Sequence, residues 1–355
     1  MTADLSRYQR QTLLKSFGLD KQSKLFESKV LIVGMGGLGI PVAQYLNAMG
    51  VGSLGLVDND TIALHNLHRQ VLYSESEVGL SKVKVAAQKL RKQNSQTDIR
   101  PISEFLDKDN ALEMIAAYDL IVDASDNFAT RYLVNDACVM LKKPFVYGAL
   151  HDFEGQVSVF NHKGGPTYRC LFPKMPKAQE VPNCDENGVL GVLPGIIGNL
   201  QALEVVKVLS GVGEVLSGKL LIFDGLTQKN RLVQFDVNPD NKKITSLQKS
   251  YGPESCKVVL SLTALEFLKG DEKKQLVDVR SHEEFKAGHL KEAIHIPLQA
   301  IATSVDKIDL GRPVYLVCQS GKRSALAAQK LVAMYPTALF YSIEGGMNQI
   351  STLCH

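Results

Sequence analysis

Residues 29–39 read KVLIVGMGGLG and join a short apolar, β-branched run to a turn rich in glycine. The glycines of this turn are Gly34, Gly36, Gly37 and Gly39, and a helical pattern follows over residues 40–49. This order predicts a buried strand, a tight turn and a helix whose N-terminal end can bind phosphate oxygens through backbone N–H groups. The stretch therefore predicts a nucleotide site, although a lone pattern of this kind also occurs as a plain strand-helix packing turn.

The composition is that of a globular chain long enough for two domains. The 355 residues are 45% hydrophobic and 22% charged, which argues against a disordered or fibrous protein. The start, MTADLSRYQRQ, is polar, and no uninterrupted apolar stretch approaches the ~20 residues of a membrane span, so we expect a cytoplasmic location. A net charge of +3 is too small to indicate nucleic acid binding.

The cysteines are widely scattered, which predicts free thiols in a chain without an export signal. They are Cys138, Cys170, Cys184, Cys256, Cys318 and Cys354. No C-x-x-C pair occurs among them. A structural zinc normally needs four closely spaced nitrogen or sulfur ligands, so the sequence holds no complete zinc site.

An acidic residue ends the second predicted strand. The apolar run 53–57 is followed by Asp58, about 20 positions beyond the glycine turn. A carboxylate at this place can accept hydrogen bonds from ribose hydroxyls. This supports a nucleotide site, but it does not distinguish NAD from ATP.

The next segment favours a triphosphate. A polar loop carries Asn66, Arg69 and Gln70, and Lys82 stands at the start of a predicted helix. A five-donor guanidinium and an ammonium near a phosphate site suit three phosphates better than a pyrophosphate. The alternative, that Arg69 and Lys82 are ordinary surface charges, stays open at this point.

A further apolar run, DLIVDAS at 119–125, is followed by Asp126 and Asn127. A carboxylate at the C-terminal end of a parallel strand can hold Mg²⁺ that bridges phosphate oxygens. We prefer Asp126 to Asp123, which strand alternation directs to the opposite face. The chain then continues, from residue 144, in a pattern more typical of antiparallel strands.

Two long polar segments follow. Residues 161–190 predict a long loop that contains Cys184, which is either a thiolate nucleophile or an ordinary exposed cysteine. Residues 238–257 are typical of an interdomain connection, of which we assign 246–257 to the linker. The predicted domains are therefore 1–245 and 258–355.

The last hundred residues resume an α/β pattern and place a cysteine in a reactive setting. The predicted strand PVYLVC leads Cys318 into the turn QSGKR, which opens a helix. Backbone N–H groups, Lys322, Arg323 and the helix dipole all favour its thiolate. Phosphatase loops place five residues between cysteine and arginine, whereas Cys318 and Arg323 enclose four, so we favour sulfur transfer.

These motifs resemble two known families. Residues 1–245 resemble the ThiF/MoeB/HesA family of ubiquitin-like-protein activating enzymes through RYQRQ, GMGGLG, VDND, HNLHRQ, the SKVK lysine, DASDN and NCDENGVLGVLPGIIGNLQALE. Residues 258–355 resemble a rhodanese domain through LVDVR, EEFKAGH, AIHIP and CQSGKRS. The resemblance implies a Rossmann-like ATP-binding domain with a mixed sheet, followed by a smaller α/β rhodanese domain.

The resemblance also implies roles for individual residues. ATP and Mg²⁺ would be surrounded by Gly36, Gly39, Asp58, Arg69, Lys82 and Asp126. Arg10, which its helical pattern alone assigns to a solvated face, would reach the phosphates of the neighbouring subunit in a homodimer. Cys184 matches the family's crossover-loop cysteine, and Cys318 matches the rhodanese cysteine that carries a persulfide.

One departure from the family concerns zinc. Members commonly bind zinc through two C-x-x-C pairs, but here residues 167–170 read TYRC and Cys256 stands without a second cysteine. Two thiols cannot complete a tetrahedral site, so we predict that structural zinc is absent. This leaves open what anchors the chain near Cys170.

The predicted activity is ATP-dependent adenylation of the C-terminal Gly-Gly carboxylate of a small β-grasp sulfur carrier. A persulfide on Cys318 would then give a thiocarboxylate. We favour the molybdopterin synthase small subunit as carrier, with the thiamine-pathway and tRNA-thiolation carriers as alternatives. From other classes, a NAD-dependent dehydrogenase or a non-catalytic carrier-binding scaffold would also use some of these motifs.

Overall fold

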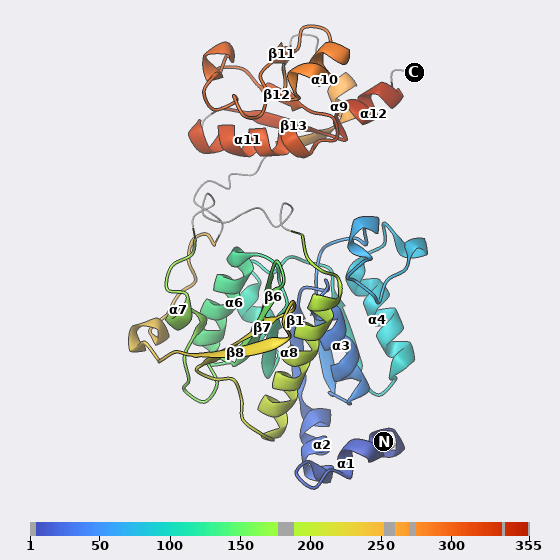
Figure 1. The fold of residues 1–355 in the computed structure, drawn as a ribbon, viewed down its shortest axis with the longest axis vertical. Coiled ribbons are helices and arrows are strands. Elements are labelled where there is room, and N and C mark those ends of the chain that lie inside the picture. The colour runs from blue at the N-terminus through green and yellow to red at the C-terminus, as the bar shows by residue number, and fades with distance from the viewer. Residues whose placement is uncertain (1–4, 177–187, 252–259, 270–273, 336–337, 354–355) are drawn as a thin grey trace. The chain divides into compact units, whose positions relative to one another are not determined.

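The computed structural model describes residues 5–176, 188–251, 260–269, 274–335 and 338–353. The chain divides into two compact units, Met1–Tyr251 and Gly252–His355. Both units combine helices with a β-sheet (Figure 1).

A mixed eight-stranded sheet forms the centre of the first unit, in the order β3-β2-β1-β4-β5-β6-β7-β8. Strands β3 to β5 of this order pair in parallel, whereas β6, β7 and β8 are antiparallel. The strands are β1 Lys29–Val33, β2 Ser53–Val57, β3 Asp98–Ile102, β4 Leu120–Asp123, β5 Phe145–His151, β6 Glu154–Phe160, β7 Lys219–Asp224 and β8 Lys229–Gln234. Successive strands are added in one direction from β1 to β3 and in the opposite direction from β4 onward. Open α/β sheets bind ligands at such a switch point, which here lies between β1 and β4.

Helices cover both faces of this sheet. They are α1 Gln9–Thr12, α2 Gly18–Glu27, α3 Gly39–Ala48, α4 Lys82–Gln93, α5 Ala111–Ala116, α6 Phe128–Leu141, α7 Tyr168–Leu171 and α8 Val192–Ser210. Among the described residues of this unit, short 3₁₀ turns accompany them: η1 Leu5–Tyr8, η2 Leu64–Asn66, η3 Glu75–Glu77 and η4 Pro239–Lys242.

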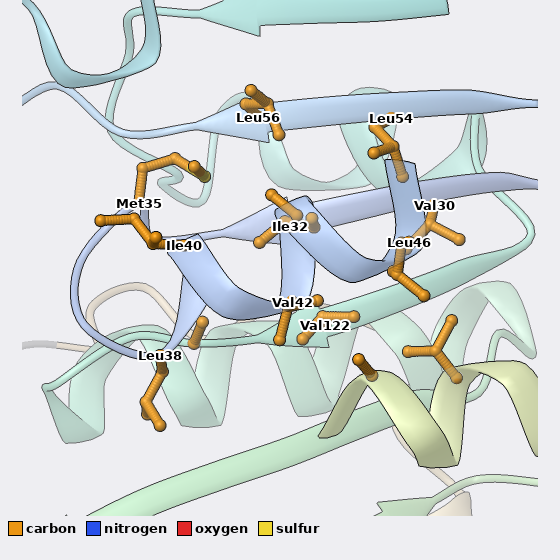
Figure 2. Packing of buried hydrophobic residues seen from close by; sticks show 14 of the residues in the cluster. Val30, Ile32, Met35, Leu38, Ile40, Val42, Leu46, Leu54, Leu56 and Val122 are labelled. Carbon is orange, nitrogen blue, oxygen red and sulfur yellow. The ribbon is translucent and has the colours of Figure 1, made fainter. Parts of the chain in front are cut away.

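Strand β1 shows why both faces are covered. Its side chains alternate between two core clusters, with Val30 and Ile32 in one and Leu31 and Val33 in the other. The first cluster includes residues of α3, which lies against β1 and β2 (Figure 2). Because both faces of β1 are buried, the run reads as continuously apolar.

Helix α8 is apolar around most of its circumference because it lies inside the first unit. It contacts α3, β5 and β6. Within the described residues it is the one helix long and apolar enough to cross a membrane, but half of it is buried in the protein. We therefore interpret α8 as a core helix.

The second unit is a smaller α/β domain with a five-stranded parallel sheet, in the order β11-β10-β12-β13-β9. The elements are β9 Leu260–Thr263, α9 Ala264–Lys269, β10 Gln275–Asp278, α10 His282–Ala287, β11 Ile294–His295, η5 Val305–Lys307, β12 Val314–Val317, α11 Lys322–Met334, β13 Phe340–Glu344 and α12 Gly346–Leu353. Apolar clusters form its core. The predicted fold class, a larger Rossmann-like domain followed by a smaller α/β domain, is confirmed.

The turn after β1 brings backbone atoms very close together. Gly34 has φ of +98°, and a Cβ atom there would lie 2.7 Å from the Ala124 carbonyl oxygen. A Cβ on Gly39 would lie 1.9 Å from the Gly34 carbonyl oxygen. At Gly36, by contrast, the nearest heavy atom would be Gln70 Nε2, at 3.6 Å. Gly34 and Gly39 are therefore required by the fold, whereas Gly36 has room for a methyl group.

This difference predicts opposite outcomes for two alanine variants. Gly39→Ala should lower the free energy of unfolding by about 1–3 kcal/mol, because backbone must shift to admit the methyl group. Gly36→Ala should change it by less than about 0.5 kcal/mol. Urea unfolding followed by circular dichroism compares the two, and equal midpoints would contradict the structural role given to Gly39.

Candidate active sites

The glycine turn and Asp58 meet at one edge of the sheet. Val33, Val57 and Asp123 are aligned in the register of β1, β2 and β4, so the residues after them lie side by side. Asp58 accepts a hydrogen bond from the Met35 N–H at 2.7 Å. Burial raises the pKa of Asp58, and the charge of Lys82 opposes this shift. Asp58, which the sequence predicts to bind ribose, thus also orders the glycine turn.

The polar loop borders the same turn. Arg69 Nη2 donates to Asn66 Oδ1 at 2.7 Å, which orients the guanidinium. Arg69 Cγ lies 3.5 Å from the place a Cβ on Gly37 would occupy, and Gln70 Nε2 lies 3.6 Å from the corresponding place at Gly36. The structure therefore brings Asn66, Arg69 and Gln70 to the glycine turn.

Lys82 begins α4, and its ammonium reaches the same region. The side chain is only 5% exposed, and Nζ donates to Asp60 Oδ2 at 2.7 Å. Asp60 is more than half exposed, so its side chain can move away from the ammonium. Tyr73, which donates to the Met35 carbonyl oxygen at 3.0 Å, ties the loop to the turn. Neither Asp60 nor Tyr73 was predicted from the sequence as a site residue, although Asp60 stands in the VDND motif.

The segment after β4 presents one carboxylate to solvent and buries another. Asp126 is exposed, whereas Asp123 is fully buried and accepts from the Ser125 hydroxyl at 2.6 Å. Burial raises the pKa of Asp123, and Arg131 opposes that shift. Arg131 also donates to the Ser125 carbonyl oxygen at 3.3 Å, so two buried charged groups hold the segment that carries Asp126. Of the two carboxylates, Asp126 is the one that a ligand can reach.

Asn127 has a structural task. Its Oδ1 accepts from the Thr130 N–H at 2.9 Å and caps α6.

Among the residues that the structure describes, no group of three or more His, Cys, Asp or Glu side chains could hold a metal. Mg²⁺ would therefore fit at Asp126 only with phosphate oxygens completing its coordination.

Two predicted site residues lie elsewhere. Arg10 is exposed on α1, and the adjacent Gln11 donates to the Met49 carbonyl oxygen at the C-terminal end of α3. The glycine turn is at the other end of α3, so Arg10 does not join the site of its own chain (Figure 1). Cys184 lies outside the described residues, as do Cys256 and Cys354.

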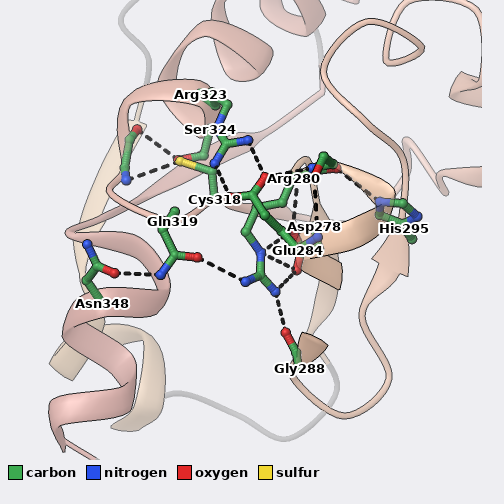
Figure 3. Close-up of polar contacts among 12 residues, drawn as sticks. Asp278, Arg280, Glu284, Gly288, His295, Cys318, Gln319, Arg323, Ser324 and Asn348 are labelled. Carbon is green, nitrogen blue, oxygen red and sulfur yellow. Dashed lines mark hydrogen bonds and ion pairs between the residues drawn. The ribbon is translucent and has the colours of Figure 1, made fainter. Parts of the chain in front are cut away.

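In the second unit, Cys318 follows β12 at the start of a tight loop (Figure 3). Its Sγ accepts from the Gly321 N–H at 3.2 Å and lies 3.6 Å from Ser324 Oγ. The loop is held by Met347, whose N–H donates to the Cys318 carbonyl oxygen at 2.8 Å. Helix α11 begins at Lys322, so its N-terminal end adjoins the sulfur.

The arginines of this loop region are paired with carboxylates. Arg323 contacts both Glu284 oxygens at 2.6 Å, and these bonds lower the pKa of Glu284 to about 2. Arg280 is buried against Asp278, with Nη2 and Oδ2 at 2.7 Å. The Cys318 sulfur thus contacts the Gly321 N–H and the Ser324 hydroxyl, whereas the Arg323 guanidinium is directed to Glu284. These carboxylates were not predicted from the sequence, although Asp278 stands in LVDVR and Ser281 and Glu284 have the S-x-x-E spacing of a capping box.

A polar network anchors the chain near Cys170. Arg169 contacts Asp136 through two hydrogen bonds of 2.7 Å, and the Tyr251 hydroxyl donates to the same carboxylate at 2.8 Å. Cys170 Sγ accepts from the Asn238 N–H at 3.3 Å. These bonds join α7 to α6 and to residues 238–251, so the first unit extends to Tyr251.

The same hydrogen bonds act on the Cys170 thiol. Burial would raise its pKa, but hydrogen bonds from Thr167 and Asn238 outweigh this effect and the pKa is lowered. The site of the expected first zinc pair is therefore occupied by an ordered hydrogen-bonded thiol. The absence of structural zinc stays a prediction.

Comparison with known proteins assigns both units. The ThiF family model matches residues 8–246, and the rhodanese-like domain model matches residues 261–353. The protein is therefore an enzyme of two transferase domains. The chain belongs to the ThiF family and carries a C-terminal rhodanese-like domain, as its motifs predicted.

Curated relatives share both domains. The adenylyltransferase and sulfurtransferase MOCS3 of Drosophila persimilis is 40% identical, and the alignment covers 97% of this chain and 83% of the relative. The protein of that name from Aedes aegypti is 41% identical, with 94% and 82% covered. The prediction of an adenylyltransferase with a sulfurtransferase domain is confirmed.

Solved structures support the fold of the first unit. E. coli MccB with MccA-N7isoASN has a TM-score of 0.61 at 25% identity, covering 68% of this chain and 75% of that chain. E. coli MccB with ATP has a TM-score of 0.59 at 25% identity, covering 66% and 73%.

The anchoring network predicts the cost of losing one carboxylate. Asp136→Asn should lower the free energy of unfolding of the first unit by about 3 kcal/mol, because it leaves Arg169 uncompensated in a largely buried position. Glu154→Gln, which removes a carboxylate from an exposed ion pair with Arg231, is the control and should cost less than about 1 kcal/mol. Urea titration measures both values, and similar losses in the two variants would contradict the anchoring role.

Proposed function

We propose that the first unit adenylates the C-terminal Gly-Gly carboxylate of a small β-grasp sulfur carrier. The observation that carries this proposal is the gathering of Asp58, Arg69 and Lys82 around the open side of the glycine turn. The relatives' names, adenylyltransferase and sulfurtransferase, support the same reaction class. ATP is the second substrate, and the cations of the site oppose its phosphate charge.

The reaction needs alignment and charge neutralisation more than proton transfer. A terminal carboxylate is already ionised at pH 7, so no general base has to activate it. Its oxygen attacks the α-phosphorus of ATP, the bond from that phosphorus to the bridging oxygen breaks, and pyrophosphate leaves. Arg69 and Lys82 stabilise the negative charge that develops on the leaving group. Lys82 would exchange its contact with exposed Asp60 for a phosphate.

The glycine turn and the polar side chains around it suit a nucleotide. The turn has room beside Gly36, and α3 begins nearby at Gly39, so the positive end of the helix dipole adjoins the turn. Asn66 orients Arg69, Gln70 lines the turn, and Asp58 is placed for the ribose. Asp126 would hold Mg²⁺, which when bound neutralises and orients phosphate oxygens. Gly34, Gly37 and Gly39 supply the close packing, and Asn127 caps the helix that follows Asp126.

The remote position of Arg10 fits a role between subunits. We propose that the enzyme is a homodimer in which Arg10 of one protomer completes the phosphate site of the other. The geometry of one chain gives Arg10 no role in its own site, since α1 adjoins the opposite end of α3.

We propose that the second unit supplies sulfur through Cys318. Its thiolate takes a sulfane sulfur from a persulfide donor, and the donor's thiolate leaves. The resulting persulfide attacks the acyl-adenylate, forms an acyl disulfide and displaces AMP. Cys184 is proposed to attack the Cys318 sulfur of this disulfide, which releases the carrier thiocarboxylate and leaves a Cys184–Cys318 disulfide for a thiol reductant.

The carrier's identity is a finer proposal. We favour the molybdopterin synthase small subunit and a cytoplasmic location; the thiamine-pathway and tRNA-thiolation carriers end in the same two glycines. Testing each carrier for a thiocarboxylate by intact mass distinguishes them. The dehydrogenase and scaffold alternatives predict, respectively, NAD binding without an ATP response and carrier binding without AMP formation.

Adenylation tests the cationic site directly. Arg69→Ala and Lys82→Ala should each lower carrier-dependent exchange of labelled pyrophosphate into ATP by ~10²-fold, because each removes a preorganised positive charge. Arg100→Ala, which removes an exposed arginine from β3, is the control and should keep normal exchange. Normal exchange by Arg69→Ala at saturating ATP would refute its role.

A sulfur-transfer assay distinguishes the function of the second unit from that of the first. Cys318→Ala should keep pyrophosphate exchange, because the nucleotide site is in the other unit, but should yield no thiocarboxylate from a persulfide donor. Cys138→Ala removes a buried core cysteine and is the matched control. Mass spectrometry of the carrier gives the result, and thiocarboxylate formed by Cys318→Ala would disprove the persulfide role.

A further inference from the structure

The charged groups beside Cys318 form two ion pairs in which every arginine has a carboxylate partner. Arg280 contacts Asp278, and Arg323 contacts Glu284 (Figure 3). Arg280 also donates to Gln319 Oε1 at 3.1 Å, which links its pair to the cysteine loop. The four groups carry no net charge. Lys322 adds a cation at the start of α11, but it is exposed and screened by solvent.

Glu284 is held in place from two directions. The Ser281 N–H donates to Oε2 at 3.0 Å, in a capping box at the start of α10. Arg323 then binds both oxygens at 2.6 Å, in the bidentate geometry that is strongest for arginine and carboxylate. The backbone thus fixes the carboxylate, and the carboxylate directs the guanidinium.

This pairing matters because sulfur donors differ in charge. With thiosulfate, the Cys318 thiolate attacks the outer sulfur, the sulfur–sulfur bond breaks, and its electron pair leaves with sulfite, a dianion. With an organic hydropersulfide, the same attack releases a single thiolate. A free arginine beside the sulfur would stabilise thiosulfate and departing sulfite, since charge-assisted bonds to oxyanions are strong.

We propose that Glu284 is a specificity-determining residue of the second unit: by neutralising Arg323, it selects organic hydropersulfide donors against thiosulfate. The inference rests on the proposed persulfide role of Cys318 and adds the residue that sets the preference between donors. Glu284 acts through Arg323 and does not contact the transferred sulfur.

The test compares two variants of the full chain that lose the same charge. Glu284→Gln keeps the amide oxygen that the capping box can use but loses the carboxylate facing Arg323. Glu283→Gln removes the adjacent, exposed carboxylate and is the matched control. For each, kcat/KM is measured at constant ionic strength with thiosulfate and with cysteine hydropersulfide, using cyanide as acceptor and thiocyanate as product.

Glu284→Gln should raise the ratio of thiosulfate to hydropersulfide kcat/KM by about five- to tenfold, mainly through a lower KM for thiosulfate. Glu283→Gln should leave the ratio within about twofold of the original. The double variant Glu284→Gln with Arg323→Gln should lose the gain, because the released guanidinium is its cause. Loss of folding alone would lower both donors together and would not move this ratio.

Three results would overturn the proposal. They are an unchanged ratio in Glu284→Gln, the same increase in Glu283→Gln, and a gain that persists without Arg323. Failure of the proposed function looks different. In that case mass spectrometry would find no persulfide on Cys318 of the original protein with either donor.

Discussion

The close approach of three strand ends supports the whole nucleotide site. Gly34 donates its N–H to the Val57 carbonyl oxygen at 2.8 Å, and the Ala124 N–H donates to the Val33 carbonyl oxygen at 2.9 Å. These bonds align β1, β2 and β4 where the strand order reverses. They permit no side chain at Gly34 or Gly39, and the same compactness places Asp58 against the turn. Fold and site therefore depend on one set of backbone contacts.

Both candidate sites hold cations in place by carboxylates. Lys82 forms an ion pair with Asp60, and Arg323 forms an ion pair with Glu284. Such a pair orients a long side chain before a substrate binds, so less conformational entropy remains to be lost on binding. The two pairs differ in strength. Asp60 is exposed and monodentate, so a phosphate can displace it from Lys82, whereas the bidentate Glu284 competes with an oxyanion for Arg323.

A hydrogen-bonded network centred on Asp136 and Cys170 joins three segments of the first unit. Asp136 receives bonds from Arg169 and Tyr251, and Cys170 receives one from the Asn238 N–H. The network connects α6, α7 and the chain end of the first unit. A buried, fully bonded carboxylate can fix three segments at once, which is also what a metal ion would do.

The sequence by itself determined the fold class and the two families, and it predicted most cationic and glycine residues of the candidate nucleotide site. It could do so because strands, glycine turns and helix starts are local patterns, and Lys82 indeed begins α4. Only the tertiary structure decided which charges are paired: Asp60 with Lys82, and Glu284 with Arg323, the latter 39 residues apart. Tertiary structure also separated exposed Asp126 from buried Asp123 and set Arg10 apart from the glycine turn. Pairing and burial arise from contacts between distant segments, which no local pattern encodes.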